Sequence, residues 1–339
     1  MHDERARTVA EVGEAALLAR VFAALRGSSR AGVGPGDDAA VLEVTSGRVV
    51  VSTDTLVHGP DFRLAWSSGE DLGWKAAAVN LADIAAMGAR PTALFVALAL
   101  PDATTVGFVE DLAAGLRAAC DELAPGCAVE GGDLTASDTL TIAVTAVGEL
   151  DGVDPVRRSG ARPGDVVALA GESGAAARGL ALLFSRFRDA DGTPIAVDAG
   201  ALTPDERHDV GRQLRPRPPI AAGAAAARAG ATAMMDVSDG LLLDATRLAD
   251  ASGVTLALDD GLSEEALRGG EDHALLACFA PSAAPPAVPA AVLPAVLPRG
   301  FRVIGRVTAR GDAAVSVGGV PATGHLGWDP HRDWDAGRG

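Results

Sequence analysis

Aspartates that lie beside glycines or hydroxyl side chains are the residues of this sequence best suited to chemistry. Asp38 follows a Gly-Pro-Gly run, Asp54 follows Ser52 and Thr53, and Asp133 follows a pair of glycines. Hard cations such as Mg²⁺ prefer oxygen ligands and bind through a few carboxylates together with substrate phosphates. The pattern therefore predicts that these aspartates converge on magnesium ions and a nucleotide.

Three further aspartates extend the set. Asp83 lies within an apolar helical segment, and Asp236 and Asp239 flank Ser238 in an Asp-Val-Ser-Asp-Gly run. Any one of these aspartates alone would be interpreted as a turn or cap residue. As a set they require another explanation, because carboxylates in apolar surroundings are costly and a cluster of them repels itself unless cations fill it. Divalent metal accounts for all of them together.

The sequence contains no Walker-type phosphate-binding motif and no protein-kinase signature. If ATP binds, metal and arginine must therefore replace the usual lysine, and Arg157 and Arg158 are the candidates. A solvated arginine pair between domains is an equally good interpretation of those two residues. Glu271 follows two glycines, which leaves room for a ligand to approach closely, although a polar turn is the alternative.

Composition limits the class of protein. The chain has 339 residues, 48% of them hydrophobic, which is enough for two domains with their own cores. A net charge of −16 argues against nucleic acid or an anionic membrane as a partner. It does not argue against a phosphorylated substrate, because a bound metal ion can reverse the local sign of the charge.

Cysteine usage and hydropathy indicate the compartment. Cys120, Cys127 and Cys278 are odd in number and lack metal-ligand spacing, so a reducing environment is expected, with a Cys120–Cys127 disulfide as the less favoured alternative. The longest apolar run, residues 92–100, is far shorter than the ~20 residues that span a membrane. No secretory signal is visible, and we expect a soluble cytoplasmic protein.

Hydrophobic periodicity predicts helices separated by short strands. The expected helices cover residues 11–26, 70–87, 105–123, 174–186, 220–229, 239–251 (capped by Ser238 or Asp239) and 263–267. The expected strands cover residues 39–44, 48–53, 92–100, 128–130, 139–150, 166–170, 232–235, 254–258, 274–279, 301–307 and 313–317, the first two forming a hairpin. The alternation favours an α/β (α+β) protein with two domains, residues 1–152 and 153–339. Residues 281–298 hold six prolines and allow at most a broken helix.

The helix expected at residues 70–87 carries two charged residues on one face, because Lys75, Val79 and Asp83 are four residues apart. Lys75 is the single lysine of the chain, and the favoured interpretation is a surface ion pair with Asp71. Asp83 lies in apolar sequence, so its carboxylate needs a partner or a metal ion.

Nine short segments, in this order along the chain, resemble the thiamine-monophosphate kinase family, which lies in the aminoimidazole-ribonucleotide-synthetase-like superfamily. The segments are Gly34–Val41, Val51–Val57, Ala78–Ala89, Glu130–Asp133, Arg158–Asp165, Leu214–Pro218, Asp236–Gly240, Gly269–Asp272 and Gly327–Trp328. The resemblance covers almost the whole chain. It implies an N-terminal mixed sheet that pairs in a homodimer and a C-terminal α/β sandwich domain.

The resemblance also implies ATP- and Mg²⁺-dependent phosphorylation of thiamine monophosphate to thiamine diphosphate, by direct in-line transfer without a phosphoenzyme. Residues at the metal positions of the family are Asp38, Ser52, Thr53, Asp54, Asp83, Asp133, Asp236 and Asp239; Asp54, Asp133 and Asp239 would act catalytically through metal. Residues at the ATP positions are Gly131, Gly132, Asp133, Arg158 and Ser238. Residues at the thiamine positions are Asp61, Glu271 and Trp328.

One position departs from the family pattern. Members usually carry histidine followed by phenylalanine after the Ser-Thr-Asp strand, whereas this chain has Asp61-Phe62, with His58 three residues earlier. Other enzymes of the superfamily and a non-catalytic metal- or nucleotide-binding regulator are the alternatives. The complete aspartate set argues against the regulator, and the cysteines expected of selenophosphate synthetase and of the hydrogenase-maturation protein are absent at the matching positions.

Overall fold

The computed structural model describes residues 4–32, 34, 39–281 and 297–328. Its α-helices are α1 (Val9–Val12), α2 (Glu14–Ala24), α3 (Gly69–Ala86), α4 (Val106–Leu123), α5 (Ala175–Arg186), α6 (Pro204–Leu214), α7 (Ile220–Arg228), α8 (Leu241–Ser252) and α9 (Glu264–Arg268). Its strands are β1 (Val49–Val57), β2 (Arg90–Leu100), β3 (Ala128–Ala136), β4 (Thr141–Glu149), β5 (Val166–Ala170), β6 (Ala231–Val237), β7 (Val254–Leu258), β8 (Ala274–Phe279), β9 (Phe301–Ala309), β10 (Val315–Val317) and β11 (Val320–Pro321). They form two mixed sheets in an α/β chain.

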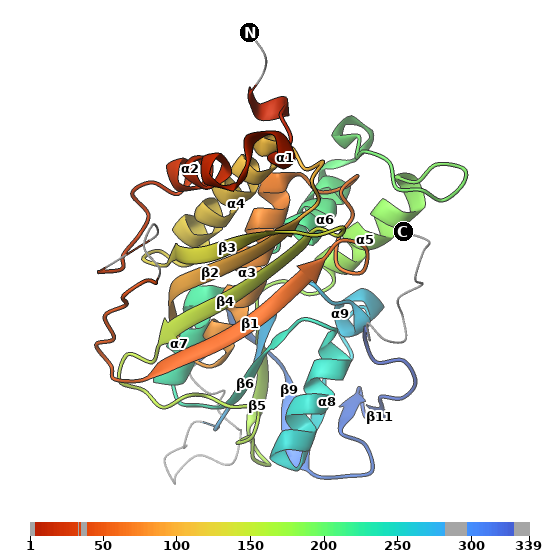
Figure 1. The fold of residues 1–339 in the computed structure, drawn as a ribbon. Helices are drawn as coiled ribbons and strands as arrows, with labels where there is room; N and C mark the ends of the chain where they lie inside the picture. The colour runs from red at the N-terminus through yellow and green to blue at the C-terminus, as the bar shows by residue number, and fades with distance from the viewer. Residues whose placement is uncertain (1–3, 33, 35–38, 282–296, 329–339) are drawn as a thin grey trace.

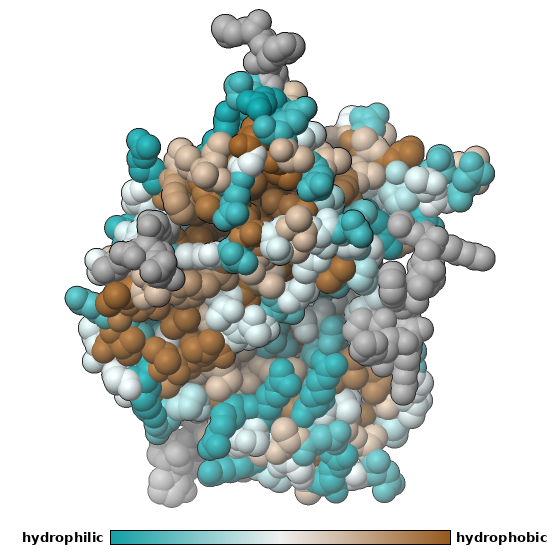
Figure 2. All heavy atoms as spheres, viewed as in Figure 1, coloured by the Kyte–Doolittle hydropathy of each residue, from teal (hydrophilic) through white to brown (hydrophobic). Residues whose placement is uncertain are grey.

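The N-terminal sheet has the strand order β1-β4-β2-β3, with β2 and β3 parallel and the other pairs antiparallel. Helices α3 and α4 cover one face, which lies behind the sheet in Figure 1. Side chains alternate between the faces of a strand, so Ser52 faces α3 while Val51, which is 58% exposed, faces away. Viewed from this second side, apolar side chains gather over the open face (Figure 2).

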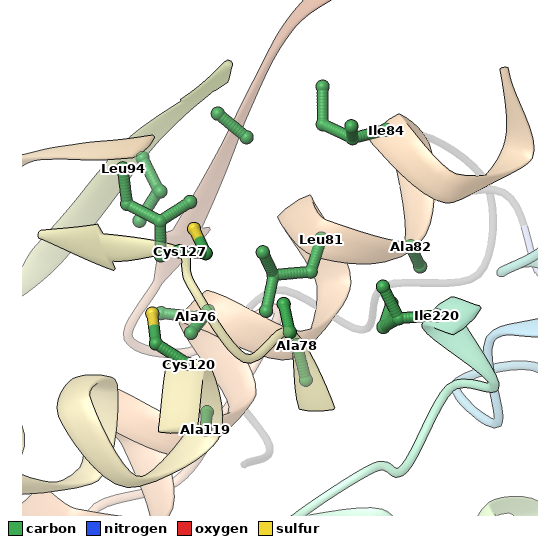
Figure 3. Packing of buried hydrophobic residues seen from close by; sticks show 14 of the residues in the cluster. Ala76, Ala78, Leu81, Ala82, Ile84, Leu94, Ala119, Cys120, Cys127 and Ile220 are labelled. Carbon is green, nitrogen blue, oxygen red and sulfur yellow. The ribbon is translucent and has the colours of Figure 1, made fainter. Parts of the chain in front are cut away.

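The C-terminal sheet has the strand order β11-β10-β7-β9-β5-β8-β6. Helices α3 and α7 connect it to the N-terminal sheet, since both contact strands of each. Gly223 of α7 permits the approach of these helices, because a Cβ there would lie 2.1 Å from the Ala85 carbonyl oxygen. Small side chains of α3 pack towards Cys120 of α4 on one side and Ile220 of α7 on the other (Figure 3). One hydrophobic core therefore joins the two sheets.

Helix α3 begins with a capping box, in which Ser68 accepts the Asp71 N–H and Asp71 accepts the Ser68 N–H. Its crossing with α4 depends on glycines: a Cβ on Gly73 would lie 1.9 Å from the Leu112 carbonyl oxygen, and one on Gly115 would lie 2.1 Å from the Glu70 carbonyl oxygen. Both contacts are with backbone atoms, which cannot move away by a change of rotamer as a side chain can. The crossing fixes the helix that carries Lys75 and Asp83.

We predict that Gly73→Ala lowers the free energy of unfolding by about 1–3 kcal/mol, because the added methyl group forces α3 and α4 apart. Gly211→Ala in α6 is the matched control, since a Cβ there has no neighbour within 4 Å. Alanine has the higher helix propensity, so Gly211→Ala is expected to raise stability by roughly 0.5–1 kcal/mol. Denaturant unfolding of both variants measures the difference, and equal stability of the two variants would contradict the close crossing.

The structure corrects four predictions about the elements. The hairpin of 39–44 with 48–53 is wrong, since β1 pairs with β4 and residues 39–44 form no strand. The single helix of 11–26 is divided at Gly13, which has a φ of 74°. Strand β3 continues through the glycine pair to Ala136. Helix α8 has Gly240 as its N-cap and no side-chain cap from Ser238 or Asp239.

Other predictions concern the cysteines and the proline-rich segment. All three cysteines are free and buried, so the Cys120–Cys127 disulfide does not form. Residues 282–296 of the proline-rich segment lie outside the described residues. Within the described part of the chain, no helix has the length and hydropathy required to cross a membrane.

Candidate active site

A cluster of carboxylates lies where α3 faces both sheets. The Ser52 hydroxyl of β1 donates a 2.7 Å hydrogen bond to Oδ2 of Asp83, on α3. Burial raises the pKa of Asp83 to about 6, and the charges of Asp236 and Asp54 add to the shift. Asp54 of β1 and Asp236 of β6 are thus close enough to perturb Asp83 of α3. Like charges held together in this way create a site for positive charge.

His273 extends the cluster, and sequence reasoning missed it. Its Nδ1 lies 3.2 Å from Oδ2 of Asp236, and both side chains are buried. Burial of the ring opposes protonation, but the hydrogen bond to Asp236 and the charges of Asp236, Glu271 and Asp83 outweigh it and raise the pKa of His273. The only sequence signal was its position directly after Gly269–Asp272.

Among the residues that the structure describes, no group of three or more acidic, histidine or cysteine side chains could hold a metal ion. Asp38, the remaining candidate from the glycine-rich loop, lies outside them. Mg²⁺ usually keeps several waters and takes only one or two carboxylates together with substrate phosphates. Asp83, with the Ser52 hydroxyl beside it, and either Asp54 or Asp236 fit that use.

The structure does not bring every predicted metal residue into this cluster. Thr53 points to the opposite face of β1, where its hydroxyl donates to the Val144 carbonyl at 3.0 Å. Asp133 lies on β3, and the register places Gly132 in one row with Val96, Val144 and Asp54. Three strand spacings of about 4.8 Å therefore separate the strands of Asp54 and Asp133, or roughly 14 Å. One metal ion cannot contact both carboxylates of the same chain.

The segment 236–240 is held by two other segments of the family pattern. The Glu271 N–H donates to the Ser238 carbonyl at 2.8 Å, and the Trp328 N–H donates to the Asp239 carbonyl at 2.8 Å. Gly270 allows the first contact, because a Cβ there would lie 2.3 Å from the Ser238 carbonyl oxygen. Glu271 itself has a φ of 73°, an uncommon conformation that is typical of functional sites. Backbone hydrogen bonds thus connect the carboxylate cluster to Glu271 and Trp328.

Asp244 supports the same segment and was not predicted. It is fully buried in the first turn of α8, and its Oδ2 accepts the N–H groups of Ser238 at 3.1 Å and Asp239 at 3.0 Å. Arg247 bridges Asp244 and Asp239, with 2.6 Å to each carboxylate. Burial raises the pKa of Asp244 to about 6. The side chain orients the turn that carries Ser238 and Asp239.

We predict that Asp244→Ala lowers the free energy of unfolding by about 2–4 kcal/mol, because two N–H groups and Arg247 lose their buried acceptor. The released turn is also expected to weaken any ligand that Ser238 or Asp239 contacts. Thermal unfolding measures the first effect, with Asp250→Ala at the exposed end of α8 as the control, where Arg310 is the partner. Equal loss in the two variants would contradict the role of Asp244.

A cavity of about 490 Å³ opens beside this segment. Asp61, Glu271, Trp328 and Ser238 all line it, so the three predicted substrate residues are brought together. Burial raises the pKa of Asp61, and Glu271 adds to the shift, while the Val57 N–H, 2.7 Å from Oδ2 of Asp61, opposes it. Trp328 is 39% exposed and lines the cavity.

The predicted surface pair between Lys75 and Asp71 is wrong. Lys75 is buried, lines the 490 Å³ cavity and forms an ion pair with Oε2 of Glu271, whereas Asp71 pairs with Arg215 from the turn after α6. Burial opposes ionisation of Glu271, but Lys75 and His273 outweigh it and lower the pKa of Glu271. The four-residue spacing correctly placed Lys75 and Asp83 on one face of α3. It could not predict the ion-pair partners, because these come from other parts of the chain.

A second cavity, of about 830 Å³, lies between α2 and the N-terminal sheet, and Gly131, Gly132 and Asp133 line it. Glu130, which also lines it, accepts N–H groups of Arg30 at 2.5 Å and Ala31 at 3.1 Å and so holds the entry to the glycine-rich loop. Arg158 is exposed and lines neither of these two cavities.

Comparison with known proteins identifies the family. A family model for AIR synthase related protein, N-terminal domain, matches residues 36–150, and one for the C-terminal domain matches residues 162–318. A Thiamine-monophosphate kinase from Mycobacterium tuberculosis (strain ATCC 25618 / H37Rv) is 40% identical over 340 residues, covering 95% of this chain and 92% of that protein. The chain belongs to the thiamine-monophosphate kinase family.

Solved structures of thiamine-monophosphate kinases share the fold. The crystal structure of the enzyme from Stenotrophomonas maltophilia K279a has a TM-score of 0.73 at 32% identity, covering 90% of this chain and 96% of that one. AaThiL complexed with AMPPCP and TMP has a TM-score of 0.69 at 31% identity, covering 94% and 97%. The expected fold of two AIR-synthase-type domains is thereby confirmed. Asp61, the position expected to depart from the thiamine-monophosphate kinase pattern, lines the cavity together with Glu271 and Trp328.

Proposed function

We propose that the protein transfers the γ-phosphoryl group of ATP to the phosphate of thiamine monophosphate, forming thiamine diphosphate and ADP. An oxygen of the acceptor phosphate attacks the γ-phosphorus in line, and the bond to the β-phosphate oxygen of ATP breaks. The observation that supports this most directly is the backbone connection of Ser238 and Glu271. It joins the segment that carries Asp236 of the aspartate cluster to Glu271, which lines the 490 Å³ cavity together with Trp328.

The phosphoryl transfer requires little covalent help, because the acceptor phosphate is already ionised at neutral pH. The requirement is alignment of two polyanions and neutralisation of their charge. Several Mg²⁺ ions would supply that neutralisation when bound, through Ser52, Asp54, Asp83 and Asp236. The other metal candidates are Asp38, Thr53, Asp133 and Asp239. Among the residues of this chain, Asp244 orients the turn of Asp239, and Ser52 orients Asp83.

For the substrate we propose the 490 Å³ cavity. Asp61 and Glu271 supply negative charge for the thiazolium ring of thiamine, and the face of Trp328 can bind the same cation. For ATP we propose Gly131, Gly132, Asp133, Arg158 and Ser238. In this assignment, residues 1–152 form the domain that binds ATP and Mg²⁺ and that dimerises. Residues 153–339 form the domain that completes the nucleotide and substrate site. We place the protein in the cytoplasm, where three free cysteines stay reduced.

We further propose a homodimer that covers the open face of the N-terminal sheet. Val49 and Val51 of β1 are 47% and 58% exposed. Apolar side chains gather over this side of the sheet (Figure 2). A dimer would bring Asp133 of one protomer towards the other and so remove it from bulk solvent. Sedimentation of wild type beside Val51→Asp tests this, with a monomeric wild type contradicting it.

The experiment for the activity is a coupled assay of the purified protein with ATP, Mg²⁺ and thiamine monophosphate. Thiamine diphosphate formed by wild type, but not by Asp54→Asn and not after chelation of Mg²⁺, is the expected result. Hydrolysis of ATP without formation of thiamine diphosphate would contradict the proposed substrate. Equal activity with and without Mg²⁺ would contradict the proposed role of the metal but not the assignment of the substrate.

A further inference from the structure

Gln213 has a buried amide oxygen without a partner among the described residues. It lies in the last turn of α6 with 6% exposure, and its Oε1 makes no hydrogen bond to any residue that the structure describes. It is also the single glutamine of the chain. An unsatisfied buried acceptor is destabilising, so such a group is retained where a ligand satisfies it.

The position of Gln213 points to a ligand, because the side chain lines the 490 Å³ cavity. Seven described lining residues come from α5 and α6: Ala177, Leu180, Ala181, Leu183, Phe184, Gln213 and Leu214. Six of them are apolar, and Gln213 alone offers hydrogen-bonding atoms. Trp66 borders the same wall, with its ring edge-on to Phe184 at a centroid distance of 5.0 Å. This wall suits a flat heterocycle that carries one polar edge.

Two parts of the cavity lining differ in chemistry. Ser238 and Glu271 are joined by a backbone hydrogen bond, and Ser238 is two residues from Asp236 of the aspartate cluster, so phosphate and metal would be on their side. The α5–α6 wall, with Gln213, is apolar and is suited to the part of a substrate that does not react. In thiamine monophosphate that part is the 4-aminopyrimidine ring, which a methylene bridge joins to the thiazolium.

We infer that the side-chain amide of Gln213 recognises the 4-aminopyrimidine edge of the acceptor, an inference that rests on the proposed function. An amide presents an acceptor oxygen and a donor NH₂ side by side. The pyrimidine edge presents the complementary pair, its exocyclic amino donor beside a ring-nitrogen acceptor. Glutamine and asparagine recognise adenine through the same pair of hydrogen bonds, to an exocyclic amino group and a neighbouring ring nitrogen. Gln213 is therefore a specificity residue that contacts the substrate without taking part in phosphoryl transfer.

The test compares two acceptors, thiamine monophosphate and its analogue with hydrogen in place of the 4-amino group. Wild type is expected to show a KM about 10- to 100-fold higher for the analogue. Gln213→Met is expected to raise the KM for thiamine monophosphate by a similar factor and to lose the discrimination, with kcat and the KM for ATP nearly unchanged, because the contact is equal in ground and transition states. Its melting temperature should not fall, since an unsatisfied acceptor has been removed.

Leu214→Met is the control, because it alters the same wall without altering hydrogen bonding; its ratio of KM values should equal that of wild type. Equal KM values of wild type for the two acceptors would overturn the inference, whatever the variants do. So would a Gln213→Met protein that still discriminates between them. If wild type forms no product from either acceptor, the proposed function fails and the inference fails with it.

Discussion

Asp83→Asn is expected to lower kcat/KM on the order of 10³-fold while making the protein without metal more stable. The activity falls because asparagine supplies no charge to hold Mg²⁺ against two polyphosphates, and such electrostatic stabilisation is commonly a large part of catalysis. Steady-state assays over a range of Mg²⁺ concentrations measure the loss. Saturating Mg²⁺ should not restore kcat fully, because the position of the ion changes as well as its affinity.

The gain in stability follows from the pKa of Asp83, which burial and the nearby charge of Asp236 raise to about 6. A carboxyl whose pKa is raised by folding destabilises the folded state above that pKa and not below the unfolded value. Removing the charge is therefore expected to add about 1–2 kcal/mol at pH 7.5 and almost nothing at about pH 3, when metal is absent. Denaturant unfolding with a chelator at both pH values is the measurement.

The control is Asp138→Asn, an exposed aspartate in the turn after β3. Its activity and stability are expected to equal those of wild type. Two outcomes would contradict the role given to Asp83: activity within a few-fold of wild type, or a loss of stability at pH 7.5. The first would remove Asp83 from the metal site, and the second would show that its carboxylate is paired rather than repelled.

Lys75→Met has the second large expected effect, on stability. Lys75 is the buried partner of Glu271, whose Oε2 is also buried although the side chain as a whole is 39% exposed. Removing one member of a buried pair leaves a charge that neither water nor protein neutralises. We expect a loss of about 2–4 kcal/mol, below the full cost of a deeply buried pair because part of the glutamate reaches solvent.

The double variant Lys75→Met, Glu271→Leu tests the cause. It is expected to recover at least half of the lost stability, since both charges are then absent. Glu122→Gln breaks the exposed pair with Arg217, at 2.9 Å, and should cost less than about 1 kcal/mol. A double variant no more stable than Lys75→Met would mean that packing of the lysine stem, and not its charge, stabilises α3.

Local sequence patterns predicted most of the elements. Strands 166–170, 254–258 and 274–279 were predicted with the boundaries observed, because continuous apolar runs between turn residues leave little choice. The hairpin of residues 39–53 failed for a different reason. Both segments have strand-like composition, but the edge that β1 pairs with is supplied by β4, about ninety residues away. Propensity cannot indicate a partner at that distance.

The site divides in the same way. Sequence identified Asp83 as a carboxylate in need of a partner, and the structure gives it a hydrogen bond from Ser52 beside two repelling carboxylates, Asp54 and Asp236. Lys75 was placed on the correct helix face, but its partner was wrong because Arg215 reaches Asp71 from 144 residues away. Asp244 and Gln213 could not be found from sequence. In the sequence each resembles an ordinary helix residue. Only the structure shows that both are buried, that Asp244 accepts two backbone N–H groups and that the Gln213 amide oxygen accepts none among the described residues.

The burial of Lys75 has a practical consequence for labelling. It is the only lysine among 339 residues, so the folded surface offers amine-reactive reagents no side-chain amine. Modification of Lys75 would therefore report transient opening of the protein around α3, and its rate under native conditions would measure how often that happens. Coupling to surfaces or fluorophores through lysine would select unfolded molecules, whereas arginine-directed reagents would not.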